Sequence, residues 1–272
     1  MTAQPARARR ARRPHVRSAA GSQSAQPNVA DTGARSLAAR GPARIRGLDA
    51  LRGIAIVAMI GYHFAFDLRH FGFTRSDFEH DPRWLTARAL ILSSFLLIAG
   101  ISAVLARAAG PTRGWLRHVA LVAGAALLVS AASWLMFPRS FIWFGVLHAI
   151  ALSLVVAHAL IDRPILAGLV GLGIVAAGAT LAHPAFDNRV LGWLGFMTAK
   201  PLTEDYVPMF PWTGVVLIGV AAGHWLAQRR FAMLLPLARA PLALQWMGRH
   251  SLVLYLVHQP LMIGVLWLVA NR

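Results

Sequence analysis

The sequence contains no cysteine and few charged residues. Because none of its 272 residues is Cys, disulfides, thiolate metal sites and a cysteine nucleophile are excluded. Charged residues make up 14% of the chain, against about 25% in an average soluble domain. Apolar residues make up 57%, and the mean hydropathy is +0.56. This composition argues against a soluble globular enzyme and against a disordered protein.

Long apolar runs recur from residue 53 to the C-terminus. Several are about 20 residues long, the length that an α-helix needs to cross the hydrocarbon core of a bilayer. The runs are continuous rather than alternating, which argues against a β-barrel. The sequence therefore predicts an all-α polytopic membrane protein with about seven transmembrane helices. We place these spans at about Leu48–Phe66, Thr86–Ala106, His118–Phe137, Phe141–Ile161, Pro164–Ala182, Val207–Ala227 and Ser251–Val269.

Basic residues are concentrated at the N-terminus. The net charge is +17, and ten of the 27 basic residues lie in the first 46 positions. With the N-terminus inside, 19 basic residues fall on the inner face and eight on the outer face, so the positive-inside rule favours a cytoplasmic N-terminus. We expect residues 1–44 to form a disordered, Arg-rich cytoplasmic tail that contacts anionic lipid rather than nucleic acid. Residues 45–272 then form a multi-pass domain in the inner (cytoplasmic) membrane.

Ionisable residues within the predicted spans are the first candidates for chemistry, because they are costly there. Arg52 and His63 are eleven residues apart in the first span, which places them on one face of a helix, about 16 Å apart along its axis. Asp67 follows His63 at i+4, within reach of the imidazole. A carboxylate beside a histidine fixes its tautomer, as a general base requires. Arg52 could equally be a positive-inside anchor. For His63 we favour catalysis over a role as an interhelical hydrogen-bonding residue.

Further polar residues lie in the later spans. We expect His148 to lie about 10 Å below the outer boundary, at a depth similar to that of His63, although a helix–helix hydrogen bond would also explain it. His258 and Gln259 lie in the middle of the seventh span, where Pro260 frees a backbone carbonyl. An exposed acid and aromatics before and within the sixth span suit sugar binding, although an interfacial aromatic belt explains the aromatics equally well. These residues are Asp205, Tyr206 and Trp212.

The order of these motifs resembles a known family. The stretch from Arg46 to Leu68, with its Arg-Gly-Ile-Ala at Arg52 and Tyr-His-Phe-Ala-Phe-Asp at Tyr62, resembles the small bacterial relatives of heparan-α-glucosaminide N-acetyltransferase. The spacing of Arg52 and His63 is also similar to that in acyltransferase-3 proteins. Further likeness lies in Phe144-Gly-Val-Leu-His148, in Asp205-Tyr-Val-Pro-Met-Phe-Pro-Trp212 and in Gly248-Arg-His-Ser-Leu-Val-Leu-Tyr255-Leu-Val-His258-Gln-Pro260.

The resemblance implies acyl transfer from acetyl-CoA or another acyl-CoA to a hydroxyl or amine of a sugar-like or envelope-glycan acceptor. Arg52 would help to bind the donor and His63 would be the catalytic histidine, with Asp67 and His148 as the other catalytic candidates. Arg249 at the inner face could meet the CoA phosphates. Substrate-binding candidates are Asp205, Tyr206, Trp212, His258 and Gln259. The animal enzyme uses a histidine in its first luminal loop, so His70 or His80 could be the counterpart instead. No metal is expected, and a homodimer is left open.

Two other classes of function remain open at this point. A transporter or flippase could use the same buried Arg, His and Asp as a proton relay. A b-type haem protein could ligate iron through His63, His148 and His258. Within the acyltransferase hypothesis, direct transfer and an acyl-histidine intermediate are both compatible with the sequence.

Overall fold

The computed structural model describes residues 45–110 and 112–271. They belong to a compact unit that spans Pro42–Arg272. The tail predicted at residues 1–44 lies outside the described residues. In the described part of the chain all regular secondary structure is helical, apart from one isolated backbone bridge between Phe144 and Tyr206.

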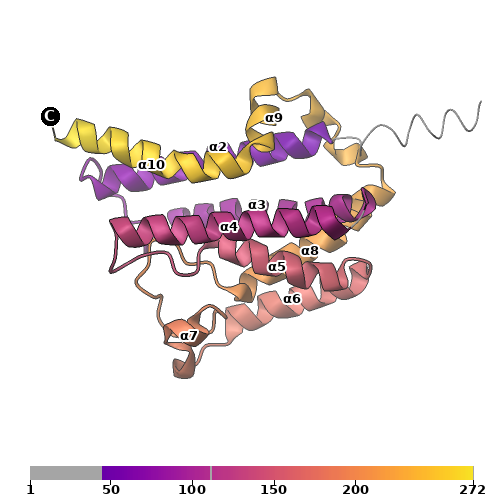
Figure 1. Cartoon of the computed structure of the whole chain (residues 1–272), viewed down its shortest axis with the longest axis horizontal. Helices are drawn as coiled ribbons and strands as arrows, with labels where there is room; N and C mark the ends of the chain where they lie inside the picture. Colours follow the sequence, from indigo (N-terminus) through magenta and orange to yellow (C-terminus); the bar gives the residue numbers. More distant parts are fainter. Residues whose placement is uncertain (1–44, 111, 272) are drawn as a thin grey trace, which may run out of the picture. The chain divides into compact units, whose positions relative to one another are not determined.

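Seven longer apolar helices and several short ones make up this unit (Figure 1). The long helices alternate in direction along the chain, so their ends fall on two opposite faces, here called the Arg46 face and the His70 face after the two ends of α2. The helices are α2 (Arg46–His70), α3 (Pro82–Ala108), α4 (Thr112–Met136), α5 (Val146–Leu160), α6 (Pro164–Thr180), α7 (Arg189–Gly192), α8 (Met209–Gln228), α9 (Leu242–Arg249) and α10 (Ser251–Ala270), with 3-10 turns η1 (Pro184–Phe186), η2 (Ala232–Leu234) and η3 (Pro236–Arg239).

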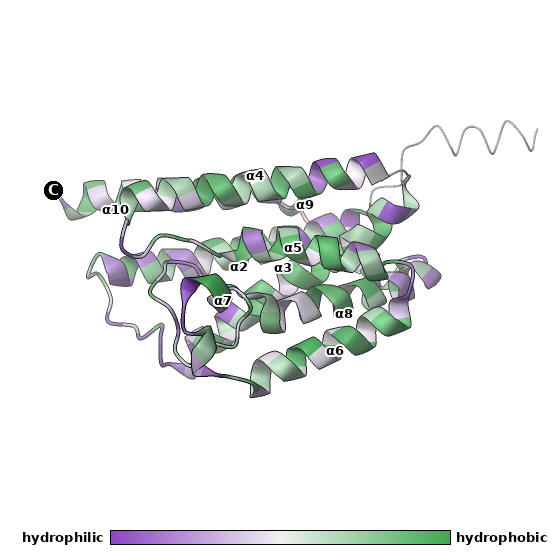
Figure 2. Ribbon diagram, turned by 60° about the horizontal axis from the view of Figure 1, so that its bottom comes forward, coloured by the Kyte–Doolittle hydropathy of each residue, from purple (hydrophilic) through white to green (hydrophobic). Residues whose placement is uncertain are grey.

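Five of these helices, α2, α3, α4, α8 and α10, are long and apolar enough to cross a membrane. Hydrophobic residues extend along most of their length, and hydrophilic residues gather toward the helix ends and in the connecting loops (Figure 2). The all-α, polytopic membrane prediction is therefore confirmed. Helices α5 and α6 have 15 and 17 residues, fewer than the about 20 of a full span, so seven crossings remain a prediction, as does the cytoplasmic N-terminus.

The fourth apolar helix begins later than expected, at Val146 rather than Phe141. Residues 140–144 are non-helical because their carbonyls bond to the segment before α8: Glu204 N–H donates to Ser140 O at 2.9 Å, and Val207 N–H to Phe144 O at 3.3 Å. A tertiary partner thus replaces the first helical turn that the hydrophobic run favoured.

Helix α8 lies at the centre of the packing. It contacts α3, α5 and α6, and its residues Val216, Leu217 and Val220 are fully buried. A side chain at Gly100 of α3 would overlap the Val216 carbonyl, and one at Gly219 would overlap Leu97. The backbones of α3 and α8 therefore touch through small residues, as is common where helices pack in a membrane.

Helix α9, in a segment where the sequence predicts no helix, holds α10 against α2. A Cβ on Gly248 would overlap the Asp49 carbonyl, and one on Gly53 would overlap the Leu244 carbonyl. The chain turns at His250 and continues as α10, which lies beside α2 (Figure 1). Since α2 and α10 both begin at the Arg46 face, the two helices are parallel.

Candidate active site

Two histidines meet between α2 and α10. His63 Nδ1 lies 3.2 Å from His258 Nε2, and His258 Nδ1 donates to the Tyr255 carbonyl at 2.6 Å. Because a carbonyl only accepts, the proton of a neutral His258 is on Nδ1, and its Nε2 accepts from His63 Nδ1–H. This chain of bonds leaves the lone pair of His63 on Nε2, the arrangement that a general base needs.

A second polar pair lies one helical turn further along the same two helices. Gln259 Nε2 donates to Asp67 Oδ1 at 3.0 Å, and Asp67 is 3% exposed. We expected Asp67 to orient the His63 ring, but in the described chain its carboxylate bonds to Gln259, and the side chain that contacts the His63 ring is His258. The i+4 spacing is present, but α10 supplies a partner to each residue.

Arg52 lies three turns from His63, toward the Arg46 face. Its guanidinium donates to Ser102 Oγ of α3 and to Asp49 Oδ1 at 3.4 Å, with 26% of the side chain exposed. His118 of α4 is close enough to interact electrostatically with Arg52. Sequence reasoning missed Ser102 and His118, since neither belongs to a recognisable motif.

His148 lies at the start of α5, less deep than expected because the helix begins at Val146. Its Nδ1 accepts from Gly145 N–H at 3.2 Å, and its Nε2 lies 3.3 Å from Ser130 Oγ. Both ring nitrogens therefore have partners at the helix terminus. His148 therefore caps the N-terminus of α5. In the described residues it has no hydrogen bond with His63 or His258.

Comparison with protein families gave a match that covers most of the chain. The model for the catalytic region of heparan-α-glucosaminide N-acetyltransferase matches residues 44–260. The chain belongs to this family. Comparison with curated proteins and with solved structures gave no match. Because the matched region ends at residue 260, it includes His63, Asp67, His258 and Gln259.

Two of the expected sugar-binding residues, Asp205 and Tyr206, bond to the backbone of neighbouring segments. Asp205 Oδ2 accepts from Val146 N–H at 2.8 Å, at the first turn of α5, and Tyr206 donates from its hydroxyl to the Gly192 carbonyl at 2.6 Å. Trp212 packs against the core around α8. Asp205 is thus partly buried rather than exposed as we expected, because the extended segment 204–207 pairs with residues 140–144.

Burial changes the acidity of these two groups. It raises the pKa of Asp205, against the smaller opposing effect of the Val146 N–H bond, and it raises the pKa of Tyr206 to about 12, with help from the Asp187 charge. The Asp187 carboxylate itself has a lowered pKa because it accepts from Thr198. Through their hydrogen bonds to Val146 and Gly192, Asp205 and Tyr206 link neighbouring segments at the His70 face.

The raised pKa of Asp205 predicts a pH-dependent stability. A carboxyl whose folded-state pKa exceeds its ordinary value of about 3.9 binds protons more readily when folded, so stability rises as pH falls through this interval and is lost as pH rises. We expect wild type to gain more thermal stability than Asp205→Asn as the pH falls from neutral toward the ordinary carboxyl value of about 3.9. The control is Asp77→Asn, since Asp77 is exposed and its pKa is lowered by backbone N–H bonds. Equal pH dependence in wild type and Asp205→Asn would contradict this assignment.

The remaining histidine candidates of the family resemblance, His70 and His80, are exposed on the His70 face. His80 Nδ1 lies 3.1 Å from Asp77 Oδ2. It borders an open hollow of about 420 Å³ whose other lining residues include Arg88 and Lys200. Neither histidine contacts α10 in the described part of the chain, which distinguishes both from His63.

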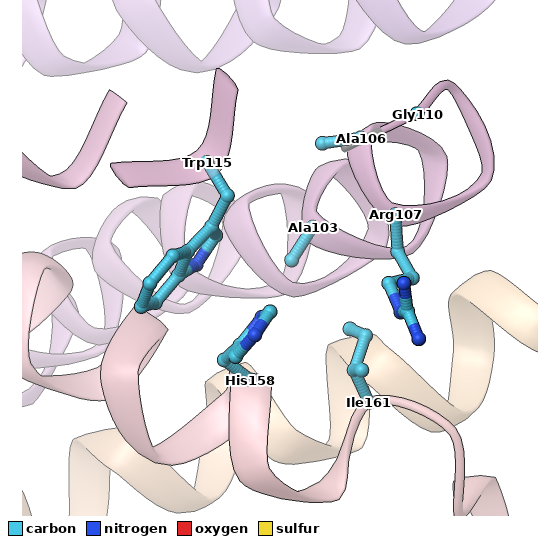
Figure 3. A pocket seen from close by; sticks show the side chains of 7 residues that line it. All are labelled: Ala103, Ala106, Arg107, Gly110, Trp115, His158 and Ile161. Carbon is cyan, nitrogen blue, oxygen red and sulfur yellow. The ribbon is translucent and has the colours of Figure 1, made fainter. Parts of the chain in front are cut away.

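At the Arg46 face, a small cavity lies between α3, α4 and α5 (Figure 3). Its volume of about 10 Å³ is near the lower limit for holding a single water. The Trp115 ring stacks on His158 with centroids 4.1 Å apart, and Arg107 donates to Asp162 at 2.9 Å. Arg249, the other residue expected to bind acyl-CoA, is exposed on this face. Its Nε–H donates to the Gln245 carbonyl at 3.3 Å.

Proposed function

We propose that this family member transfers an acyl group, in the first instance acetyl, from acyl-CoA to a hydroxyl or amine of a sugar-like acceptor. Membership of the N-acetyltransferase family supports the reaction class. The His63–His258–Tyr255 hydrogen-bond chain is the observation that supports the residue assignment, because it presents a histidine lone pair inside an apolar helix bundle.

In this mechanism His63 Nε2 accepts the proton of the acceptor hydroxyl or amine. The acceptor atom attacks the thioester carbonyl, the carbon–sulfur bond breaks, and the CoA thiolate receives the proton from the imidazolium. His258 stabilises the positive charge of His63 by accepting from its Nδ1–H. One proton and one acyl group are thus transferred between the two substrates, and the step requires neither a metal nor a redox partner.

The two substrates approach from opposite faces in this proposal. Arg52 and the exposed Arg249 would bind the anionic CoA moiety at the Arg46 face. The acceptor, an envelope glycan or a smaller sugar, would enter from the His70 face, where His63 and Asp67 lie within the last two turns of α2. A cytoplasmic N-terminus in the inner membrane would make the first face cytoplasmic, where acyl-CoA is available.

The function is tested by following thioester consumption by the purified full-length protein in nanodiscs. Acetyl-CoA is supplied with and without glucosamine, glucose and envelope oligosaccharides. We expect CoA thiol to be released only when both donor and a suitable acceptor are present, and the acyl group to appear on the acceptor. Failure of acetyl-CoA and longer acyl-CoAs to bind or react with every acceptor would contradict the proposed function.

A further inference from the structure

Two buried oxygen atoms beside the histidine pair have no hydrogen-bond donor. They are Asp67 Oδ2 and Gln259 Oε1, and within the described residues neither finds a partner. Asp67 is almost fully buried, with 3% of its surface exposed. Its other oxygen is bonded to Gln259 Nε2. A buried polar atom without a hydrogen-bond partner is unfavourable relative to the same atom in water, so these atoms are expected to receive hydrogens from something outside the helix pair.

The amide orientation of Gln259 strengthens this conclusion. If its oxygen and nitrogen were exchanged, Oε1 would face Asp67 Oδ1, and two acceptors would be opposed. The orientation with Nε2 toward Asp67 is therefore the one that an ionised carboxylate accepts. Both remaining atoms are acceptors, so the site favours a group with polar hydrogens and repels carboxylates and phosphates.

The position of the pair relative to His63 identifies what it could hold. Asp67 lies one turn from His63 on α2, at a Cβ separation of about 5–6 Å, and Gln259 directly follows His258 on α10. The pairs His63–His258 and Asp67–Gln259 thus form adjacent rungs between the same two helices. A ligand bound at the Asp67–Gln259 pair would therefore lie about one helical turn from the His63–His258 pair.

We propose that Asp67 Oδ2 and Gln259 Oε1 bind the acceptor through two polar hydrogens on neighbouring atoms, and so orient it toward His63. The shared chemistry is a pair of adjacent donors, either two hydroxyls or a hydroxyl and an amine. This inference rests on the proposed acyl transfer for its assignment of the ligand as acceptor. It adds a recognition site distinct from the base.

The test uses Asp67→Asn, which keeps the shape of the side chain and removes its negative charge. An Asn amide can donate to Gln259 Oε1, so a merely structural pair would be fully satisfied in this variant. We expect the KM for the acceptor to rise about tenfold or more, the fold-change for a lost hydrogen bond to a charged group. The KM for acyl-CoA should stay unchanged. Asp77→Asn, an exposed Asp on the same face, is the matched control.

The acceptor itself supplies the second arm of the experiment. Acceptors methylated singly at each hydroxyl, or at the amine, are compared with the parent sugar on wild type and on Asp67→Asn. We expect methylation at either of two adjacent positions of the acceptor to weaken its binding to wild type and to have little further effect on Asp67→Asn. These positions then show whether the two bound groups are two hydroxyls or a hydroxyl and an amine. A second variant, Gln259→Met, should raise the acceptor KM in the same way.

Direct binding of a labelled acceptor separates the failure of this inference from that of the proposed function. If wild type turns over and Asp67→Asn has an unchanged acceptor KM, the pair is a structural contact satisfied by a proton or a water, and the inference is wrong. If wild type shows no turnover, sugar binding that weakens in Asp67→Asn still supports the site. Absence of sugar binding to wild type overturns it.

Discussion

Replacement of His63 by Ala is expected to lower acceptor-dependent acyl transfer by about 10²–10⁴-fold, the usual contribution of a general base. The loss should fall on kcat, because His63 acts on a proton that moves only during the reaction. Acyl-CoA binding at the Arg46 face should be retained, since Arg52 lies about 16 Å from His63 along the α2 axis and keeps its contact with Ser102.

The control for this experiment is His250→Ala. His250 is exposed at the junction of α9 and α10, and its ring bonds to the Trp246 carbonyl of the preceding turn. Its replacement should leave the rate within about twofold of wild type, which is the scale of a small surface effect. Full activity of His63→Ala would transfer the base to another histidine, for example His80 at the open hollow.

Replacement of Gly248 by Ala is expected to destabilise the protein by about 1–3 kcal/mol, the usual effect of overpacking. The added Cβ would overlap the Asp49 carbonyl, which is part of the α2 backbone and cannot rotate away. Helix α9 would have to move off α2, and α10 with its His258–Gln259 pair would move with it. Thermal unfolding in detergent, followed by tryptophan fluorescence, measures the change.

The same substitution at Gly124 of α4 is the matched control. A Cβ at Gly124 meets nothing within 4 Å, and alanine is favoured over glycine in a helix by about 1 kcal/mol. Gly124→Ala is therefore expected to stabilise the protein while Gly248→Ala destabilises it. A shift of the same sign for both variants would contradict the close approach of α9 to α2.

The helices are predictable from the sequence wherever an apolar run has no backbone hydrogen-bond partner in another segment. The continuous runs predict the helices because a span in lipid must satisfy its own backbone bonds. The prediction is wrong at Phe141, where the run is apolar but its carbonyls bond to residues 204–207. It also misses α9, because an eight-residue helix has no span-length signal and depends on packing against Gly53.

The candidate site is predictable in its members but not in its pairing. Arg52, His63 and Asp67 stand out because ionisable residues are rare in spans, and His258 and Gln259 because they interrupt an apolar run. Reasoning about one helix pairs Asp67 with His63 at i+4. Only the parallel approach of α10 to α2, fixed by contacts of α9, gives each of the two residues a partner on the other helix.

A double-mutant cycle on His63 and His258 tests the account most directly. Acceptor-dependent kcat/KM is measured for wild type, His63→Ala, His258→Ala and the double variant. If His258 acts by holding the tautomer of His63, the double variant is no slower than His63→Ala, because residues that work as a unit are not additive. If the two losses multiply, the histidines act independently, and the hydrogen-bond chain from Tyr255 to His63 is not the basis of catalysis.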